Sequence, residues 1–140
     1  MEGNVCIGLR EDLKKMERLV ARQLQDALKA FVDLDLDESD RIAERDDVVD
    51  NLNLHIEELA QSIQASPLQS DDARFVRSAV KVALNLERIG DAACHIARRV
   101  DIAISEGHRF VPFDMDEMEA ISLAAVRESV ESYLNRDIRM

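Results

Sequence analysis

Apolar residues recur at three- and four-residue steps along four stretches of the chain. This spacing is typical of α-helices that bury one face. The first stretch runs from Leu9 to Leu34, the second from Ile42 to Ile63 and the third from Phe75 to Ala103, and the fourth begins after Gly107. No convincing period-two alternation interrupts them. The pattern therefore predicts an all-α protein without a sheet.

Capping and breaking residues mark the ends of the predicted helices. Asp37 is expected to be the N-cap of the second helix, which ends before Ser66-Pro67 because the residue before a proline disfavours helical geometry. Ser70 opens the third helix with two aspartates in its first turn. Asp114 and Glu117 resemble a capping box at the start of the fourth. The short connections favour an antiparallel bundle.

The fourth stretch resembles the first when the two are aligned at a fixed offset. Met16-Glu17 corresponds to Met118-Glu119, and at the same offset Phe31 corresponds to Tyr133. Self-similarity of this kind indicates a repeated structural unit. We therefore expect residues 1–140 to form a single domain. Within it, residues from about 10 to 105 would make a complete three-helix repeat, and residues from about 114 to 138 the first helix of an incomplete second repeat.

The composition supports helices and limits the classes of function. Hydrophobic residues make up 46% of the 140 residues, aromatic residues only 4%, and glycine and proline are scarce, a balance that favours helix over strand. The net charge of −11 opposes binding to nucleic acid. No stretch approaches the ~20 apolar residues of a membrane span, and the N-terminus is not a signal peptide. A cytoplasmic protein with reduced thiols at Cys6 and Cys94 is expected.

Two acidic pairs are the main candidates for chemistry. Asp46 and Asp50 are four residues apart on the second predicted helix, and Glu87 and Asp91 are four apart on the third. Residues at this spacing share a helix face, so each pair is repulsive unless a cation, a base or water lies between the carboxylates. All-carboxylate sites suit hard or borderline cations. The alternative is solvated surface, with the acids neutralised by arginines such as Arg45.

Three neighbours of the second pair could add to a site or simply serve packing. A glycine inside a helix, such as Gly90, lowers helix stability by about 1 kcal/mol relative to alanine. We therefore expect that something must come close to the backbone there, either a neighbouring helix or a ligand held between Glu87 and Asp91. His95 lies four residues after Asp91. It is either a nitrogen ligand of a metal ion or a surface histidine paired with an acid. Cys94 is expected to be a small packing residue.

The segment Leu86-Glu87-Arg88-Ile89-Gly90-Asp91 resembles the signature of the PhoU family, bacterial and archaeal regulators of phosphate uptake and phosphate-starvation signalling. The segments Arg45–Asp50 and Ser70–Arg74 are similar to other parts of that family. The resemblance implies a protein made of three-helix repeats without catalytic activity of its own. The phosphate transporter's ATPase subunit and a phosphate-sensing histidine kinase are the partners it implies.

The same resemblance implies multinuclear metal clusters of Fe, Zn, Mn or Mg on (Glu/Asp)-x-x-x-Asp motifs. Carried over by position, the ligands are Asp46, Asp50, Glu87 and Asp91. The second repeat's motifs are absent from this chain. A homodimer is expected, because the lone fourth helix should leave an apolar surface exposed, formed by Leu123, Val126, Val130 and Leu134.

Two alternative functions remain open from the sequence. One is a PhoU-like regulatory module detached from a larger ion or sodium–phosphate transporter. The other is a helical-bundle metalloenzyme, because di-iron proteins also use carboxylates in bundles of this size. Those enzymes carry Glu-x-x-His motifs, and no glutamate in this sequence has a histidine three residues later. The metalloenzyme is therefore the weaker alternative.

Overall fold

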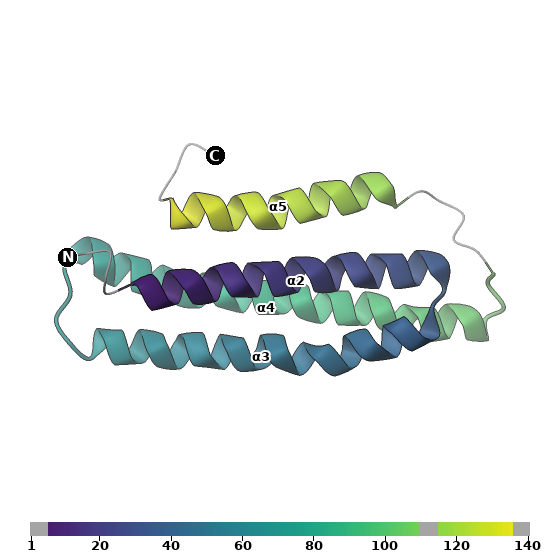
Figure 1. Cartoon of the computed structure of the whole chain (residues 1–140), viewed down its shortest axis with the longest axis horizontal. Coiled ribbons are helices and arrows are strands. Elements are labelled where there is room, and N and C mark those ends of the chain that lie inside the picture. The colour runs from purple at the N-terminus through teal and green to yellow at the C-terminus, as the bar shows by residue number, and fades with distance from the viewer. Residues whose placement is uncertain (1–5, 110–114, 136–140) are drawn as a thin grey trace.

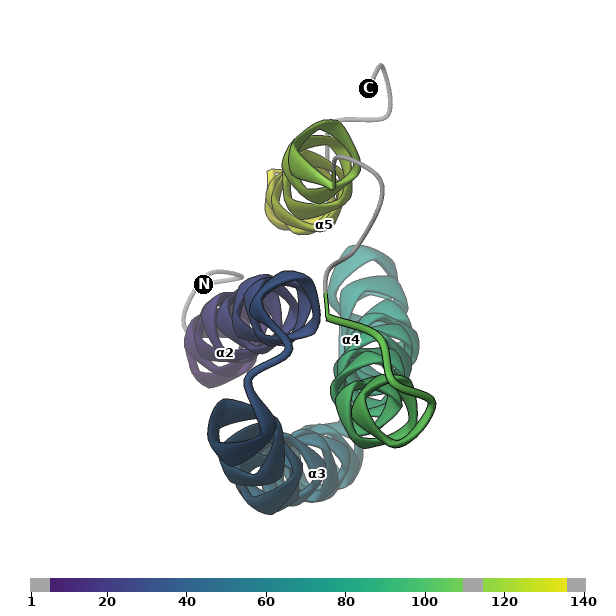
Figure 2. The ribbon, with the colours of Figure 1, turned by 90° about the vertical axis from the view of Figure 1, so that its right-hand side faces the viewer.

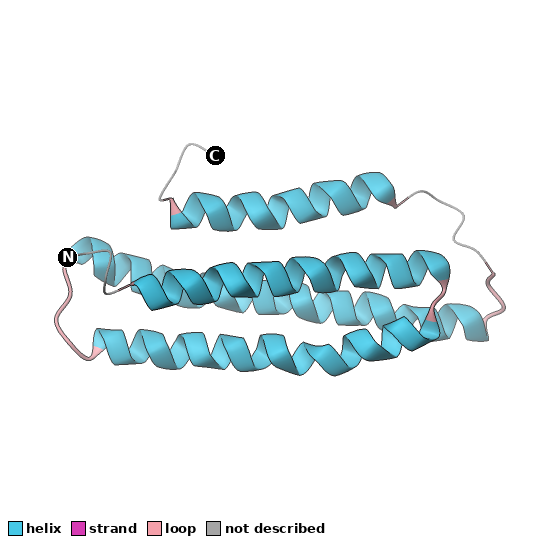
Figure 3. Cartoon of the chain, viewed as in Figure 1, coloured by secondary structure: helices cyan, strands magenta, loops and turns pink. Residues whose placement is uncertain are grey.

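The computed structural model describes residues 6–109 and 115–135, and within them the chain forms four α-helices and no strand (Figures 1 and 3). The four helices are α2 (Ile7–Asp33), α3 (Leu36–Gln64), α4 (Ser70–Ser105) and α5 (Asp116–Leu134). Consecutive helices run in opposite directions along one long axis (Figure 1). The predicted antiparallel all-α bundle is therefore confirmed.

The bundle proper consists of three helices, and the fourth packs on its outside. Seen end-on, α2, α3 and α4 surround a common centre, and α5 lies beyond α2 and α4, on the opposite side from α3 (Figure 2). The buried core follows the predicted apolar stripes, with Leu13, Met16 and Val20 fully buried on α2. On α4 the core positions include Ala79, Ala83, Ala93 and Ala97, whose small side chains allow neighbouring helices to approach closely.

The connection from α2 to α3 differs from the prediction. Leu34 adopts the left-handed conformation at φ 52° and ψ 44° and ends α2. Asp35 is then the N-cap of α3, and its side chain accepts a hydrogen bond from the Glu38 backbone N–H at 3.1 Å. The prediction of Asp37 as the cap was wrong, since the left-handed turn at Leu34 lets α3 begin earlier. Asp37 instead lies in the first turn, where its charge favours the helix dipole.

The other predicted helix ends agree more closely with the structure. α3 ends at Gln64, two residues before Ser66-Pro67, and α4 begins at Ser70. Asp114, the expected cap of the last helix, lies outside the described residues, and α5 begins at Asp116.

The expectation of an exposed apolar stripe on the last helix was wrong. Val126, Val130 and Leu134 are buried in the same core cluster as α2 and α4, and Leu123 is partly buried. These residues lie on the side of α5 that faces the bundle, so α2 and α4 cover the apolar stripe of α5.

The C-terminal end of α5 is held by an aromatic stack. The rings of Phe75 and Tyr133 are stacked with centroids 4.9 Å apart, and the Arg10 guanidinium lies 4.6 Å from the Phe75 ring centroid. The Tyr133 hydroxyl donates a hydrogen bond to the Phe75 carbonyl, and Arg10 donates to the Leu134 carbonyl. The stack therefore joins the beginnings of α2 and α4 to the end of α5.

No helix in the described part of the chain is long and apolar enough to cross a membrane.

Candidate metal-binding site

The four predicted ligands meet at the edge where α3 packs against α4. Asp46 and Asp50 come from α3, and Glu87 and Asp91 come from α4. The charges of Asp50, Asp91 and Asp46 all act on the Glu87 carboxyl, which shows that the structure brings the two pairs together. All four side chains are half-buried. Glu87 and Asp91 therefore lie at the edge of this helix interface, partly covered by it.

Burial and mutual repulsion raise the pKa of two of these carboxyl groups, Asp50 and Glu87. Burial raises the pKa of Asp50 above its ordinary value, and the charge of Asp46 raises it further. Burial also raises the pKa of Glu87, followed by the charge of Asp50. A hydrogen bond between the two carboxyl groups raises the pKa of Glu87 and lowers that of Asp50. A bound cation would reverse both upward shifts.

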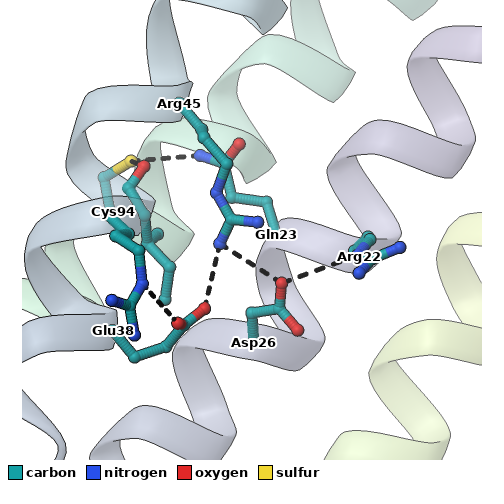
Figure 4. A network of polar contacts seen from close by, with 8 residues as sticks. Arg22, Gln23, Asp26, Glu38, Arg45 and Cys94 are labelled. Atoms are coloured by element: carbon teal, nitrogen blue, oxygen red, sulfur yellow. Dashed lines mark hydrogen bonds and ion pairs between the residues drawn. The ribbon is translucent and has the colours of Figure 1, made fainter.

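The arginine that could neutralise these acids is engaged elsewhere. Arg45 binds Asp26 at 3.3 Å and Glu38 at 3.2 Å, on the side of α3 that faces α2 (Figure 4). Within residues 6–109 and 115–135, no lysine or arginine makes an ion pair with any of the four candidate ligands. Asp50 Oδ1 is buried without a hydrogen-bond partner in the described chain, and both interpretations of the acids, a metal site and solvated surface, stay predictions.

A buried glutamine holds one of the acids in place. Gln23 of α2 is only 5% exposed, and its Nε2 donates to Asp46 Oδ1 at 3.1 Å and to the Gly90 carbonyl at 2.9 Å. The same nitrogen lies 3.0 Å from Cys94 Sγ (Figure 4). Sequence reasoning missed this residue. The available signal was a polar side chain within the apolar stripe of α2, next to Leu24.

Gly90 is explained by packing between helices. A Cβ atom at this position would lie 3.4 Å from Val49 Cγ1, 3.7 Å from Val20 Cγ2 and 3.9 Å from Asp46 Oδ1. Its neighbours are therefore side chains of α2 and α3. Of the two explanations considered for this glycine, the close approach of neighbouring helices is the one that the contacts support.

His95 and Cys94 behave as their simpler interpretations predict. His95 Nε2 lies 3.4 Å from Asp91 Oδ2, and the histidine is exposed. Burial raises the pKa of the Cys94 thiol to about 11, so the thiol stays protonated at neutral pH and is a poor metal ligand. Cys94 instead packs in the core and contacts Gln23.

The four acids concentrate negative charge, but they are not arranged as a complete metal-binding site. Across the described residues, no group of three or more His, Cys, Asp or Glu side chains is arranged to hold a metal ion as it stands. What the arrangement offers is an all-oxygen set on two packed helices, of the kind that hard and borderline cations prefer. The four ligands stay a prediction.

Comparison with known proteins identifies the family. A family model described as the PhoU domain matches residues 13–100 of this chain. The chain belongs to the PhoU family. The matched residues run from α2 to near the end of α4 and include the four acids, Gln23 and Gly90, so the whole candidate site lies inside the PhoU domain.

Individual PhoU proteins match most of this chain. The phosphate-specific transport system accessory protein PhoU homolog 1 of Thermotoga maritima is 29% identical, over 93% of this chain and 57% of its own length. PhoU of Escherichia coli K12 is 28% identical, over 94% of this chain and 55% of its own length. The Pseudomonas aeruginosa homolog is 36% identical, over 71% of this chain and 41% of its own length. The chain thus spans about half the length of the curated PhoU relatives it matches.

Proposed function

We propose that this chain is a cytoplasmic PhoU-type regulator that restrains phosphate transport and phosphate-starvation signalling. The observation that supports this most directly is the PhoU domain match over residues 13–100, together with relatives named as accessory proteins of a phosphate-specific transport system. The partners we propose are the transporter's ATPase subunit and a phosphate-sensing histidine kinase. In this proposal the protein acts by binding and has no catalytic reaction of its own.

The regulatory role is tested by deleting the gene and measuring phosphate-starvation transcripts in phosphate-rich medium. Loss of a restraining adaptor should switch these genes on, and the wild-type gene supplied in trans should switch them off again. Unchanged transcripts in the deletion strain would contradict the regulatory role. Copurification with the tagged ATPase subunit or the tagged kinase would separate the two partners.

The second part of the proposal is that the adaptor binds metal through Asp46, Asp50, Glu87 and Asp91. It is supported by the half-buried position of these acids, the raised pKa of Asp50 and Glu87, and the engagement of Arg45 elsewhere. A divalent or trivalent ion of Fe, Zn, Mn or Mg would neutralise the repulsion, with water completing its coordination. The shallow site at a helix edge implies modest affinity.

Metal binding is tested by titrating the metal-free chain with each ion in a calorimeter, followed by analysis of bound metal. Glu87→Ala/Asp91→Ala should take up less metal than the wild type. Asp40→Ala/Glu44→Ala is the matched control, because it removes two acids of the same spacing from exposed positions on α3. Equal uptake by the wild type and the site variant, or no uptake by the wild type with any ion, would contradict the site.

A further inference from the structure

The outward side of α4 forms a strip of positive charge on a protein whose net charge is −11. We call this strip the basic face. It consists of Arg74, Arg77, Lys81, Arg88 and Arg99, all of which are exposed. Successive members are three, four, seven and eleven residues apart, so they share one side of the helix. At 1.5 Å per residue the basic face is about 38 Å long.

The basic face contains no acid. Between Arg74 and Arg99, α4 has two acidic residues, Glu87 and Asp91, and both are half-buried at the edge that packs against α3. Among residues 6–109 and 115–135, no side chain of the basic face takes part in an ion pair. Five cations of the described chain therefore face solvent without an acidic partner, which is the charge pattern of a surface that binds an anionic group.

Acidic helices lie on both sides of the basic face. Seen end-on, α4 lies between α3 and α5 along one side of the molecule, and α2 lies on the other side (Figure 2). α3 contains nine acidic residues, two arginines and no lysine, and α5 contains five acidic residues and one arginine. The positive charge is therefore confined to a strip one helix wide, about 10 Å across. A lipid bilayer or a nucleic-acid duplex would also meet the acids on both sides of the strip, whereas a narrow acidic partner would not.

One apolar side chain is exposed within the basic face. Leu84 is 37% exposed, and it lies seven residues after Arg77, three after Lys81 and four before Arg88. An apolar residue surrounded by charged ones is shielded from water when a partner covers it, as at the centre of many protein interfaces. The basic face is unsuited to pack against a further helix of the same chain, because burying its cations without acidic partners is strongly unfavourable.

We propose that the basic face of α4 binds an acidic amphipathic helix of a partner protein. A helix with glutamate or aspartate at four- and seven-residue steps presents its acids at the same spacing as Arg77, Lys81 and Arg88, so each acid meets a cation. An apolar side chain of the partner, placed between those acids, packs on Leu84.

The size of this contact predicts weak and reversible binding. One helix lying on one helix buries less than the roughly 800 Å² per partner of a standard interface. We therefore expect a micromolar dissociation constant that rises with salt concentration. This binding needs neither a bound metal nor the phosphate-regulatory role, so it stands apart from the function proposed above.

The first test measures fluorescence anisotropy of a fluorescein-labelled amphipathic peptide that carries glutamates around a central leucine. The whole chain should bind it, and Lys81→Glu/Arg88→Glu should weaken binding at least about tenfold, because like charges would then oppose each other. Lys14→Glu/Lys15→Glu is the matched control, since it changes the net charge equally at two exposed lysines of α2. Circular dichroism checks that each variant stays helical. A wild type that does not bind the peptide, or equal weakening by both double variants, would overturn the proposal.

Three further measurements separate the acidic helix from other occupants. Leu84→Ala should weaken peptide binding several-fold, whereas Leu54→Ala, at a residue that is 55% exposed on α3, should not. Vesicles of phosphatidylcholine and phosphatidylserine should bind less tightly than the peptide, and so should single-stranded poly-uridine. Tighter binding of the vesicles or of the RNA, lost in Lys81→Glu/Arg88→Glu, would overturn the proposal in favour of a lipid or nucleic-acid surface.

The last test identifies what contacts the basic face in cells. A photoreactive benzoylphenylalanine in place of Leu84 should crosslink to an acidic helical segment of another protein, and the same group in place of Leu54 should not. That segment, made as a peptide, should bind the wild type and not Lys81→Glu/Arg88→Glu. No crosslink at position 84, or crosslinks there only to segments that are not acidic, would overturn the proposal.

Discussion

Replacing Asp50 by asparagine should make the metal-free protein more stable at neutral pH. Asp50 lies close to the charges of Asp46, Asp47 and Asp91, and its Oδ1 is buried without a hydrogen-bond partner in the described residues. A like-charge pair at this spacing costs about 0.2–0.5 kcal/mol. Removing three such repulsions gives roughly 1 kcal/mol, and the new amide can donate a hydrogen bond to Glu87.

The pH dependence follows from the raised pKa of Asp50. A carboxyl group whose pKa is higher in the folded than in the unfolded state binds more protons when folded, so stability falls as the pH rises. The stabilising contribution is complete below the unfolded value of about 4 and is lost as the pH rises through the folded pKa. Asp50→Asn should therefore gain stability relative to the wild type at pH 7 and little in acid.

Thermal and urea unfolding followed by circular dichroism, with a chelator present, measure this effect. A gain of about 1 kcal/mol corresponds to a rise in Tm of roughly 3 °C for a chain of this size. Glu58→Gln, an exposed carboxylate-to-amide change on α3, should change Tm little. With metal at 100 times Kd the wild type should gain about 2.7 kcal/mol, and Asp50→Asn should gain much less. If Asp50→Asn is less stable than the wild type without metal, the repulsion argument is refuted.

Four further substitutions test the packing of the bundle. Gln23→Leu should destabilise the fold by about 1–3 kcal/mol in urea unfolding, because the Gly90 carbonyl loses a buried donor. An unchanged midpoint would show that the amide is dispensable. Gly90→Ala should raise stability by up to about 1 kcal/mol, since its Cβ would make ordinary contacts at 3.4 Å or more, whereas Gly90→Leu should lower stability. Tyr133→Phe should lower the free energy of unfolding by about 0.5–1.5 kcal/mol and should speed amide hydrogen exchange in α5. Exchange rates equal to those of the wild type would contradict the anchoring of that helix.

The sequence was sufficient to predict the helices, because their apolar stripes are long and regular. Ser70 begins α4 as predicted, but the cap of α3 was misplaced because Leu34 adopts a left-handed conformation that is unusual for a leucine. Periodicity identified Val126 and Val130 as one stripe and could not tell that the bundle itself covers them.

The candidate site was predictable in its residues and not in its surroundings. The four-residue spacing places Glu87 and Asp91 on one face of a helix whatever the packing is. Which helix lies opposite, and how deeply the carboxyl groups are covered, depends on contacts between distant segments. Gln23 illustrates this most clearly, because its partners at Asp46 and Gly90 are 23 and 67 residues away along the chain.

The single amide nitrogen of Gln23 makes α2 sensitive to events at the acidic edge. Gln23 belongs to α2, whereas its acceptors belong to α3 and α4. An ion that drew Asp46 toward itself would weaken the Gln23–Asp46 hydrogen bond and so change how firmly α2 is held. By thermodynamic reciprocity, a protein that bound α2 and shifted this amide would alter the affinity for the ion by the same factor. In the proposed function, this hydrogen bond would be a short physical route by which metal occupancy and partner binding regulate each other.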